Sequence, residues 1–93
     1  MTEGQANTWN LEVIVMPKAG VNDPQGDAVR SGLHSLGFDN TTRVRIGKRI
    51  RLEVQAASED EALAQGHEMC DRLLANPVIE EYTIGIIEGE DKA

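Results

Sequence analysis

A ten-residue stretch rich in proline and glycine constrains this chain more than any other part of its sequence. The two prolines fix the backbone angle φ and remove an amide donor, and the two glycines open backbone conformations that other residues avoid. These four residues are Pro17, Gly20, Pro24 and Gly26. Asp23 before Pro24 is typical of a helix N-cap followed by proline in the first helical position. The stretch therefore joins a strand to a helix. It is either an ordinary turn between them or a surface that contacts a partner.

Apolar periodicity predicts six elements in the order β-α-β-β-α-β. The predicted strands span 9–16, 41–46, 49–56 and 78–88, and the predicted helices span 24–36 and 59–75. Gly47-Lys48 is interpreted as the hairpin turn between the two middle strands. Gly37 is typical of the left-handed residue that ends a helix, and Ser58 with Glu61 three residues on is typical of a capping box that begins one. Asn76-Pro77 ends the second helix, because the residue before a proline is pushed towards extended backbone. The pattern predicts a two-layer α+β, ferredoxin-like fold, with two helices on one face of a four-stranded antiparallel sheet.

Ninety-three residues are enough for a single small domain. We expect this domain to span 9–88, with a flexible amino-terminal extension at 1–8 and a frayed tail at 89–93. Some apolar side chains have the parity of the second face of the sheet, which we expect a second copy to cover. These residues are Ile14, Met16, Ile79 and Ile87. The sequence therefore predicts a dimer, and the alternative is that these are single exposed apolar residues of no consequence.

The composition excludes several classes of partner. A net charge of −7 opposes binding to nucleic acids and anionic membranes, and only three aromatic residues are present for base stacking. The sequence shows neither a signal peptide nor an apolar run of the ~20 residues that cross a membrane, so we expect a cytoplasmic protein. Cys70 is the single cysteine and lies on a helical apolar stripe, so it is interpreted as a small core residue.

A basic segment stands out in this acidic chain. Five of the nine lysines and arginines are Arg43, Arg45, Lys48, Arg49 and Arg51. In the predicted hairpin the four arginines share one face, where like charges repel unless something compensates them. The compensating group could be Glu53 and other acids of a second copy, an acidic partner surface or a phosphate-bearing ligand. A solvated sheet face is the remaining alternative.

The sequence shows no recognisable catalytic, cofactor-binding or metal-binding pattern. Cys70 could be paired with His34 or His67 as nucleophile and base, but nothing else in the sequence supports that assignment. One cysteine and two scattered histidines lack the spacing of metal ligands, and no glycine-rich phosphate loop is present. We therefore assign no catalytic, cofactor or metal residue and do not expect a stand-alone enzyme.

Four groups of residues, spread over most of the chain, form a recognisable set. They are Pro17-Lys18-x-Gly20-Val21-x-Asp23-Pro24-Gln25-Gly26-x-Ala28-Val29, Leu36-Gly37-Phe38, Val44-Arg45-x-Gly47-Lys48 and Cys70-x-x-Leu73-Leu74-Ala75-Asn76-Pro77-Val78-Ile79-Glu80. Together these groups resemble the PurS subunit of phosphoribosylformylglycinamidine (FGAM) synthase. The resemblance covers Leu11 to Glu88. Asn22 replaces an expected aliphatic residue, and the extension through Thr8 is not part of the pattern.

The resemblance implies a small non-catalytic subunit, dimeric or tetrameric, in an enzyme complex of purine biosynthesis. A PurQ-type glutaminase would release ammonia, and a PurL-type synthetase would use ATP and Mg²⁺ to activate the formyl amide that ammonia attacks. The small subunit would bridge the two and help to protect the ammonia route, without a cofactor of its own. The class of enzyme is a glutamine-dependent, ATP-consuming ligase.

The site residues follow from the resemblance and from the basic segment. The expected partner interface comprises Lys18, Asp23, Gln25, Arg43, Arg45 and Lys48. The expected structural loop residues are Pro17, Gly20, Pro24, Gly26, Gly47, Asn76 and Pro77. An alternative function is a dimeric regulatory domain that senses a small metabolite. A sensor would gain thermal stability with its ligand, whereas a bridging subunit would not.

Overall fold

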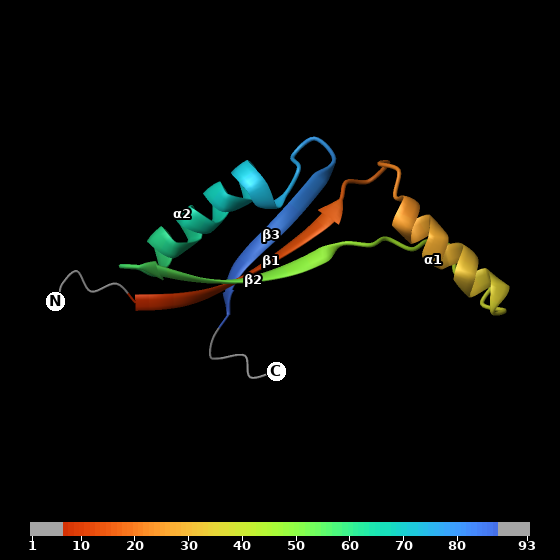
Figure 1. The fold of residues 1–93 in the computed structure, drawn as a ribbon, viewed down its shortest axis with the longest axis horizontal. Coiled ribbons are helices and arrows are strands. Elements are labelled where there is room, and N and C mark those ends of the chain that lie inside the picture. The colour runs from red at the N-terminus through yellow and green to blue at the C-terminus, as the bar shows by residue number, and fades with distance from the viewer. Residues whose placement is uncertain (1–6, 88–93) are drawn as a thin grey trace.

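The structure, a computed structural model, describes residues 7–87, which form an antiparallel sheet of three strands in the order β2-β1-β3, with two α-helices and one π-helical turn (Figure 1). The elements are β1 (Asn7–Pro17), α1 (Pro24–Ser35), β2 (Lys48–Ala56), α2 (Glu59–Met69), the π turn (Cys70–Leu74) and β3 (Glu80–Ile87). The extension and tail predicted at 1–8 and 89–93 lie outside the described residues, except that Asn7 and Thr8 begin β1.

The middle strand β1 pairs with a strand on each side. Val13, for example, faces Ile50 on β2 and Ile84 on β3. Leu11, Val13 and Val15 are fully buried because α2 and the π turn cover this face. Cys70 is fully buried in the same core, as predicted. The core of the described chain is therefore one layer of side chains between α2 and the sheet.

The prediction of a fourth strand at 41–46, followed by a hairpin turn at Gly47-Lys48, is wrong. The segment 41–47 belongs to no strand, and Lys48 begins β2, which pairs directly with β1. The polar groups of this segment bind the first helix and its cap instead. The Ile46 amide donates to the Asp23 carboxylate (2.9 Å), and the Thr41 carbonyl oxygen lies 2.8 Å from His34 Nε2.

Gly47 is required for a close approach and not for a turn. Its φ is not in the left-handed region, and a Cβ at this position would lie 2.3 Å from the Val15 carbonyl oxygen. Glycine therefore lets the chain pass against the end of β1 as it enters β2. The sequence pattern shows the glycine but does not show which of the two roles it has.

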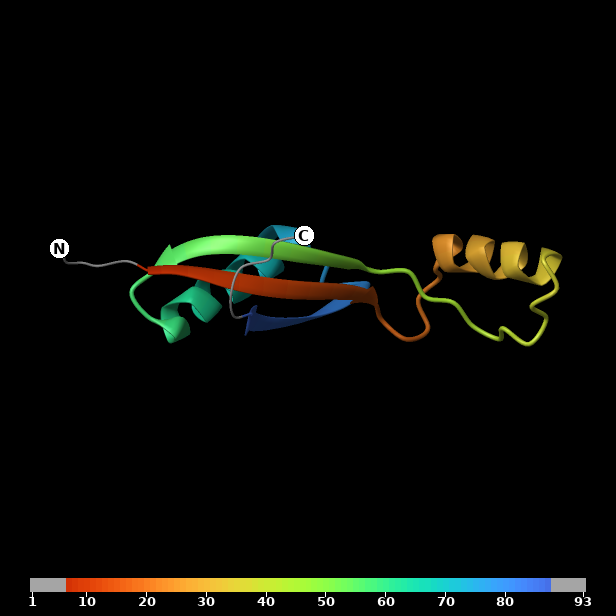
Figure 2. The ribbon, with the colours of Figure 1, turned by 90° about the horizontal axis from the view of Figure 1, so that it is seen from below.

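The prediction that two helices share one face of the sheet is also wrong. Within residues 7–87, α2 and the π turn that follows it lie over the sheet, whereas α1 projects beyond the end of it (Figures 1 and 2). We call residues 18–47, which comprise α1 and its two connections, the arm. The molecule measures 60 × 31 × 15 Å, and its radius of gyration of 17.6 Å exceeds the roughly 12 Å of a compact chain of this length. The described chain is therefore open and elongated.

The ends of the helices follow the sequence predictions closely. The Asp23 side chain caps α1 by accepting from the Gly26 amide (3.0 Å). Gly37, with φ of 98°, ends α1 in the predicted left-handed conformation, and the Phe38 amide donates back to the Leu33 carbonyl. Ser58 caps α2 as predicted, by accepting from the Glu61 amide. These local signals determine the helix ends but not where the helices dock.

Candidate assembly surfaces

The proline- and glycine-rich stretch lies against the turn before β3. The Lys18 amide donates to the Ile79 carbonyl (2.8 Å), and Lys18 Nζ donates to the Pro77 carbonyl (2.7 Å). Asn76 arranges that turn, because its side-chain oxygen accepts from the Val78 amide. Two groups of residues that are about sixty positions apart in the sequence therefore form one structural unit. Sequence reasoning identified both groups but did not predict their contact.

Asp23 joins the two connections of the arm. Its carboxylate accepts from the Gly26 amide at the start of α1 and from the Ile46 amide just before β2. These two hydrogen bonds, and to a lesser degree the charge of Arg45, hold the pKa of Asp23 below its usual value of 3.8. Arg45 also donates to the Pro17 carbonyl. The base of the arm is therefore fastened by side chains from both of its connections.

The lowered pKa of Asp23 predicts a pH dependence of stability. Because the folded-state pKa lies below the unfolded-state value, the stabilisation is fully present above about pH 4. It is lost as the pH falls from there through the folded-state pKa. We expect Asp23→Asn to be less stable than the parent at pH 7 and to lose less stability between pH 4 and pH 2. Thermal unfolding at a series of pH values measures both effects, and parallel curves for the two proteins would contradict the assignment.

The six predicted interface residues lie around the base of the arm. Lys18, Asp23 and Arg45 make the internal contacts described above, whereas Gln25, Arg43 and Lys48 are exposed. Most of these residues line one of two small pockets. Gln25 and Lys48 line the first, of about 160 Å³, together with Val15, Ile46, Gly47 and Glu80. Asp23, Arg43 and Arg45 line the second, of about 170 Å³, with Asp27 and Arg30 among their neighbours. Their contact with a partner stays a prediction.

The arginines of the predicted hairpin do not share one face. Arg43 and Arg45 belong to the arm, whereas Arg49 and Arg51 lie on β2. Glu12 on β1 compensates the second pair: Arg49 Nε binds its carboxylate, and Arg51 Nη2 lies 3.9 Å from it. Sequence reasoning missed Glu12, although the antiparallel pairing of β1 with β2 places it opposite Arg51.

The outer face of the sheet carries part of the predicted apolar surface. Ile14, Met16 and Ile87 have the parity opposite to the buried set and are half-buried, whereas Ile79 precedes β3. Ile14 and Met16 border a shallow pocket of about 330 Å³ together with Glu81, Tyr82 and Thr83. The face is thus mixed, because Glu12 and its arginine partners occupy the same side.

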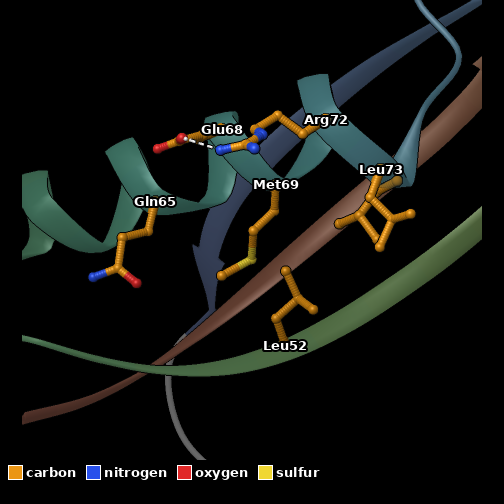
Figure 3. A pocket seen from close by; sticks show the side chains of 7 residues that line it. Leu52, Gln65, Glu68, Met69, Arg72 and Leu73 are labelled. Atoms are coloured by element: carbon orange, nitrogen blue, oxygen red, sulfur yellow. Dashed lines mark hydrogen bonds and ion pairs between the residues drawn. The ribbon is translucent and has the colours of Figure 1, made fainter.

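An apolar groove of about 490 Å³ lies beside α2, on the face of the sheet that the core occupies (Figure 3). Met69 from α2, Leu73 from the π turn and Leu52 from β2 form its walls, and an Arg72–Glu68 ion pair (3.1 Å) lies at its rim. Leu73 is 82% exposed, which is unusual for an aliphatic side chain beside a core. Sequence reasoning missed this groove, because it assumed that a second helix would fill it.

The residues considered for chemistry lie apart from one another. Cys70 is fully buried, and burial, followed by the nearby Asp71 carboxylate, raises the pKa of its thiol. His34 belongs to the arm, and His67 Nδ1 lies 2.9 Å from the Tyr82 hydroxyl. Within residues 7–87, no three His, Cys, Asp or Glu side chains gather closely enough to hold a metal ion. In the same range, no helix is both long and apolar enough to span a membrane.

The fold and these surfaces define an α+β subunit whose prominent features are suited to association. They are a projecting helical arm, an open apolar groove and the loop at 17–26, which hydrogen bonds from Lys18 hold in place and which we call the fastened loop. The PurS family model, described as phosphoribosylformylglycinamidine (FGAM) synthase, matches residues 10–88. The chain therefore belongs to the PurS family.

Individual relatives support this assignment. The FGAM synthase subunit PurS of Synechocystis sp. is 44% identical over 81 residues, which are 87% of this chain and 81% of that protein. The solved structure of Bacillus subtilis PurS is 40% identical and has a TM-score of 0.77, covering 86% of this chain and 99% of that one. A chain of the PurLQS structure from Thermotoga maritima is 30% identical and has a TM-score of 0.79, with 87% and 99% covered.

Proposed function

We propose that this chain is the non-catalytic bridging subunit of an FGAM synthase complex in purine biosynthesis. It joins a PurQ-type glutaminase to a PurL-type, ATP-dependent synthetase and supports the transfer of ammonia between them. The observation that carries the proposal is the family match over residues 10–88, together with the likeness to a chain of the Thermotoga maritima PurLQS structure. ATP and Mg²⁺ belong to the synthetase, and the complex works in the cytoplasm.

The shape of the chain suits a bridging role. The arm and the sheet lie at opposite ends of a molecule 60 Å long, so the chain offers two separate surfaces to two partners (Figure 2). The fastened loop at 17–26 lies between these ends, next to the exposed Gln25 and Lys48. We propose further that the chain acts as a homodimer, because its small core leaves apolar side chains uncovered on both the arm and the groove.

Omission of this subunit from a reconstituted complex tests the proposal. The glutaminase and synthetase subunits are assayed for glutamine-dependent formation of the amidine, with and without this chain. We expect activity only when the chain is added, and we expect the three proteins to elute as one complex. Ammonia in place of glutamine is the control, because the synthetase would then need no bridge. Glutamine-dependent activity that is indifferent to the chain would overturn the bridging role and favour the ligand-sensing alternative.

A further inference from the structure

We propose that a pocket at the base of the arm binds the phosphate group of a small ligand. The pocket has a volume of about 170 Å³ and lies between α1 and the return segment 41–47. We call it the basic pocket, and its charged lining residues are Asp23, Asp27, Arg30, Arg43 and Arg45. The inference goes beyond the proposed function and does not rest on it, since a subunit that joins two partners can also bind an anion.

The basic pocket gathers three arginines from two parts of the arm. Arg30 lies on α1, and Arg43 and Arg45 belong to the return segment, which runs back beside the helix (Figure 2). Like charges that are brought together repel one another unless an anion compensates them. Glu12 compensates the arginines of β2, but it lies on the sheet. The arginines of the arm therefore need a different counter-charge.

The aspartates of the basic pocket do not balance its arginines. Three guanidinium groups against two carboxylates leave one positive charge in excess. Both oxygens of Asp23 already accept hydrogen bonds from backbone amides, at 3.0 and 2.9 Å. Within residues 7–87, neither Arg30 nor Arg43 forms an ion pair. An anion in the pocket would therefore meet two guanidinium groups that have no other anionic partner in the described chain.

Arg30 supplies a second observation that points to a ligand. Its Nε is buried and is the one buried side-chain nitrogen or oxygen of the described residues that has no hydrogen-bond partner. A charged group that loses its water without gaining a partner costs free energy. An anion in the pocket that Arg30 lines would offset this cost through its charge, even without touching Nε itself.

The size and donors of the basic pocket favour a phosphate group. Its volume lies below the roughly 300 Å³ at which pockets begin to enclose a whole drug-sized ligand, so the rest of the ligand would stay in solvent. A tetrahedral phosphate offers oxygens to guanidinium groups that come from two elements, whereas a carboxylate offers two oxygens to a single guanidinium fork. The amino terminus of α1, which Asp23 caps at the pocket, adds partial positive charge.

Titration of the isolated chain with inorganic phosphate at constant ionic strength tests the site. We expect saturable binding in isothermal titration calorimetry. Arg43→Gln removes one guanidinium group and should weaken this binding about tenfold or more. Asp27→Asn removes a repelling carboxylate and should strengthen it. Arg72→Gln is the matched control, because it makes the same change of charge on the π turn, outside the pocket, and should leave the binding unchanged.

Arg30→Met separates a binding role from a structural one. Methionine keeps an unbranched apolar side chain but removes both the charge and the unpartnered Nε. We expect this variant to be at least as stable as the parent in urea without phosphate, because the unpartnered group costs free energy in the empty pocket. We also expect it to bind phosphate about tenfold or more weakly. Lower stability together with unchanged phosphate binding would show that Arg30 only supports the arm, and would overturn the site.

Two further ligands identify the source of the phosphate group. Methyl phosphate represents a phosphomonoester, and acetate represents a carboxylate such as a partner side chain would present. Methyl phosphate that binds at least as tightly as inorganic phosphate would assign the site to a phosphomonoester, and weaker binding would assign it to the free ion. Acetate that binds as tightly as phosphate, or phosphate binding that Arg43→Gln and Arg72→Gln weaken equally, would overturn the proposal. Neither result would bear on the bridging assay with the partner subunits.

Discussion

Lys48→Glu is expected to abolish the association of this chain with its partner subunits and to leave its fold intact. Lys48 begins β2 at the base of the arm, where its side chain is exposed beside Gln25 and Glu80. At the proposed interface with an acidic partner surface, reversing its charge replaces attraction by repulsion and adds a second carboxylate near Glu80. We expect the affinity for the partners to fall about a hundredfold or more, and glutamine-dependent activity to fall with it. Co-elution of the three subunits measures the first effect.

Graded variants at the same position separate charge from shape. Lys48→Arg should keep the association, whereas Lys48→Gln should weaken it to an intermediate degree. Lys18→Glu acts in the same direction but also removes the hydrogen bond from Lys18 Nζ to the Pro77 carbonyl, so its effect combines a lost contact with a structural change. Unchanged co-elution of Lys48→Glu with both partners would remove this residue from the interface.

The local features of the fold could be predicted from the sequence, because each depends on neighbouring residues. Asp23 and Ser58 cap the two helices as expected, and Gly37 ends the first one. The prediction of a fourth strand at 41–46 was wrong because an alternating pattern shows only that a segment is extended. At 41–47 the Thr41 carbonyl and the Ile46 amide bind His34 of α1 and its cap Asp23, and the segment belongs to no strand.

The candidate site was predictable in its residues and not in its arrangement. The fastened loop and the turn at Asn76-Pro77 were each identified, but their contact through Lys18 is a long-range one. The groove was missed for a different reason. A pattern of helices and strands does not say whether a helix packs on its own sheet or on that of another molecule. Both arrangements bury the same apolar side of the helix. The close packing of Gly47 against the end of β1 and the direction of the arm decide this question, and only the structure shows them.

Gly47→Ala is expected to lower the free energy of unfolding by about 2–3 kcal/mol. A Cβ at this position would lie 2.3 Å from the Val15 carbonyl oxygen and 2.2 Å from Met16 Sδ. The methionine side chain can move away, but the carbonyl belongs to the central strand and is held in the sheet. The added methyl group must therefore push the base of the arm away from β1. Urea unfolding at one fixed protein concentration measures the loss, because the proposed association of two copies would make the stability depend on concentration.

Gly32→Ala is the matched control for this steric effect. Gly32 lies within α1 and no atom would meet its added Cβ within 4 Å, so alanine should stabilise the helix by about 0.5–1 kcal/mol. The same chemical change is thus expected to have opposite signs at two glycines of the arm. If Gly47→Ala proves as stable as Gly32→Ala, the base of the arm relaxes at no cost, and its direction is not fixed by this contact. The opposite signs would instead show that the base of the arm resists displacement from the end of β1.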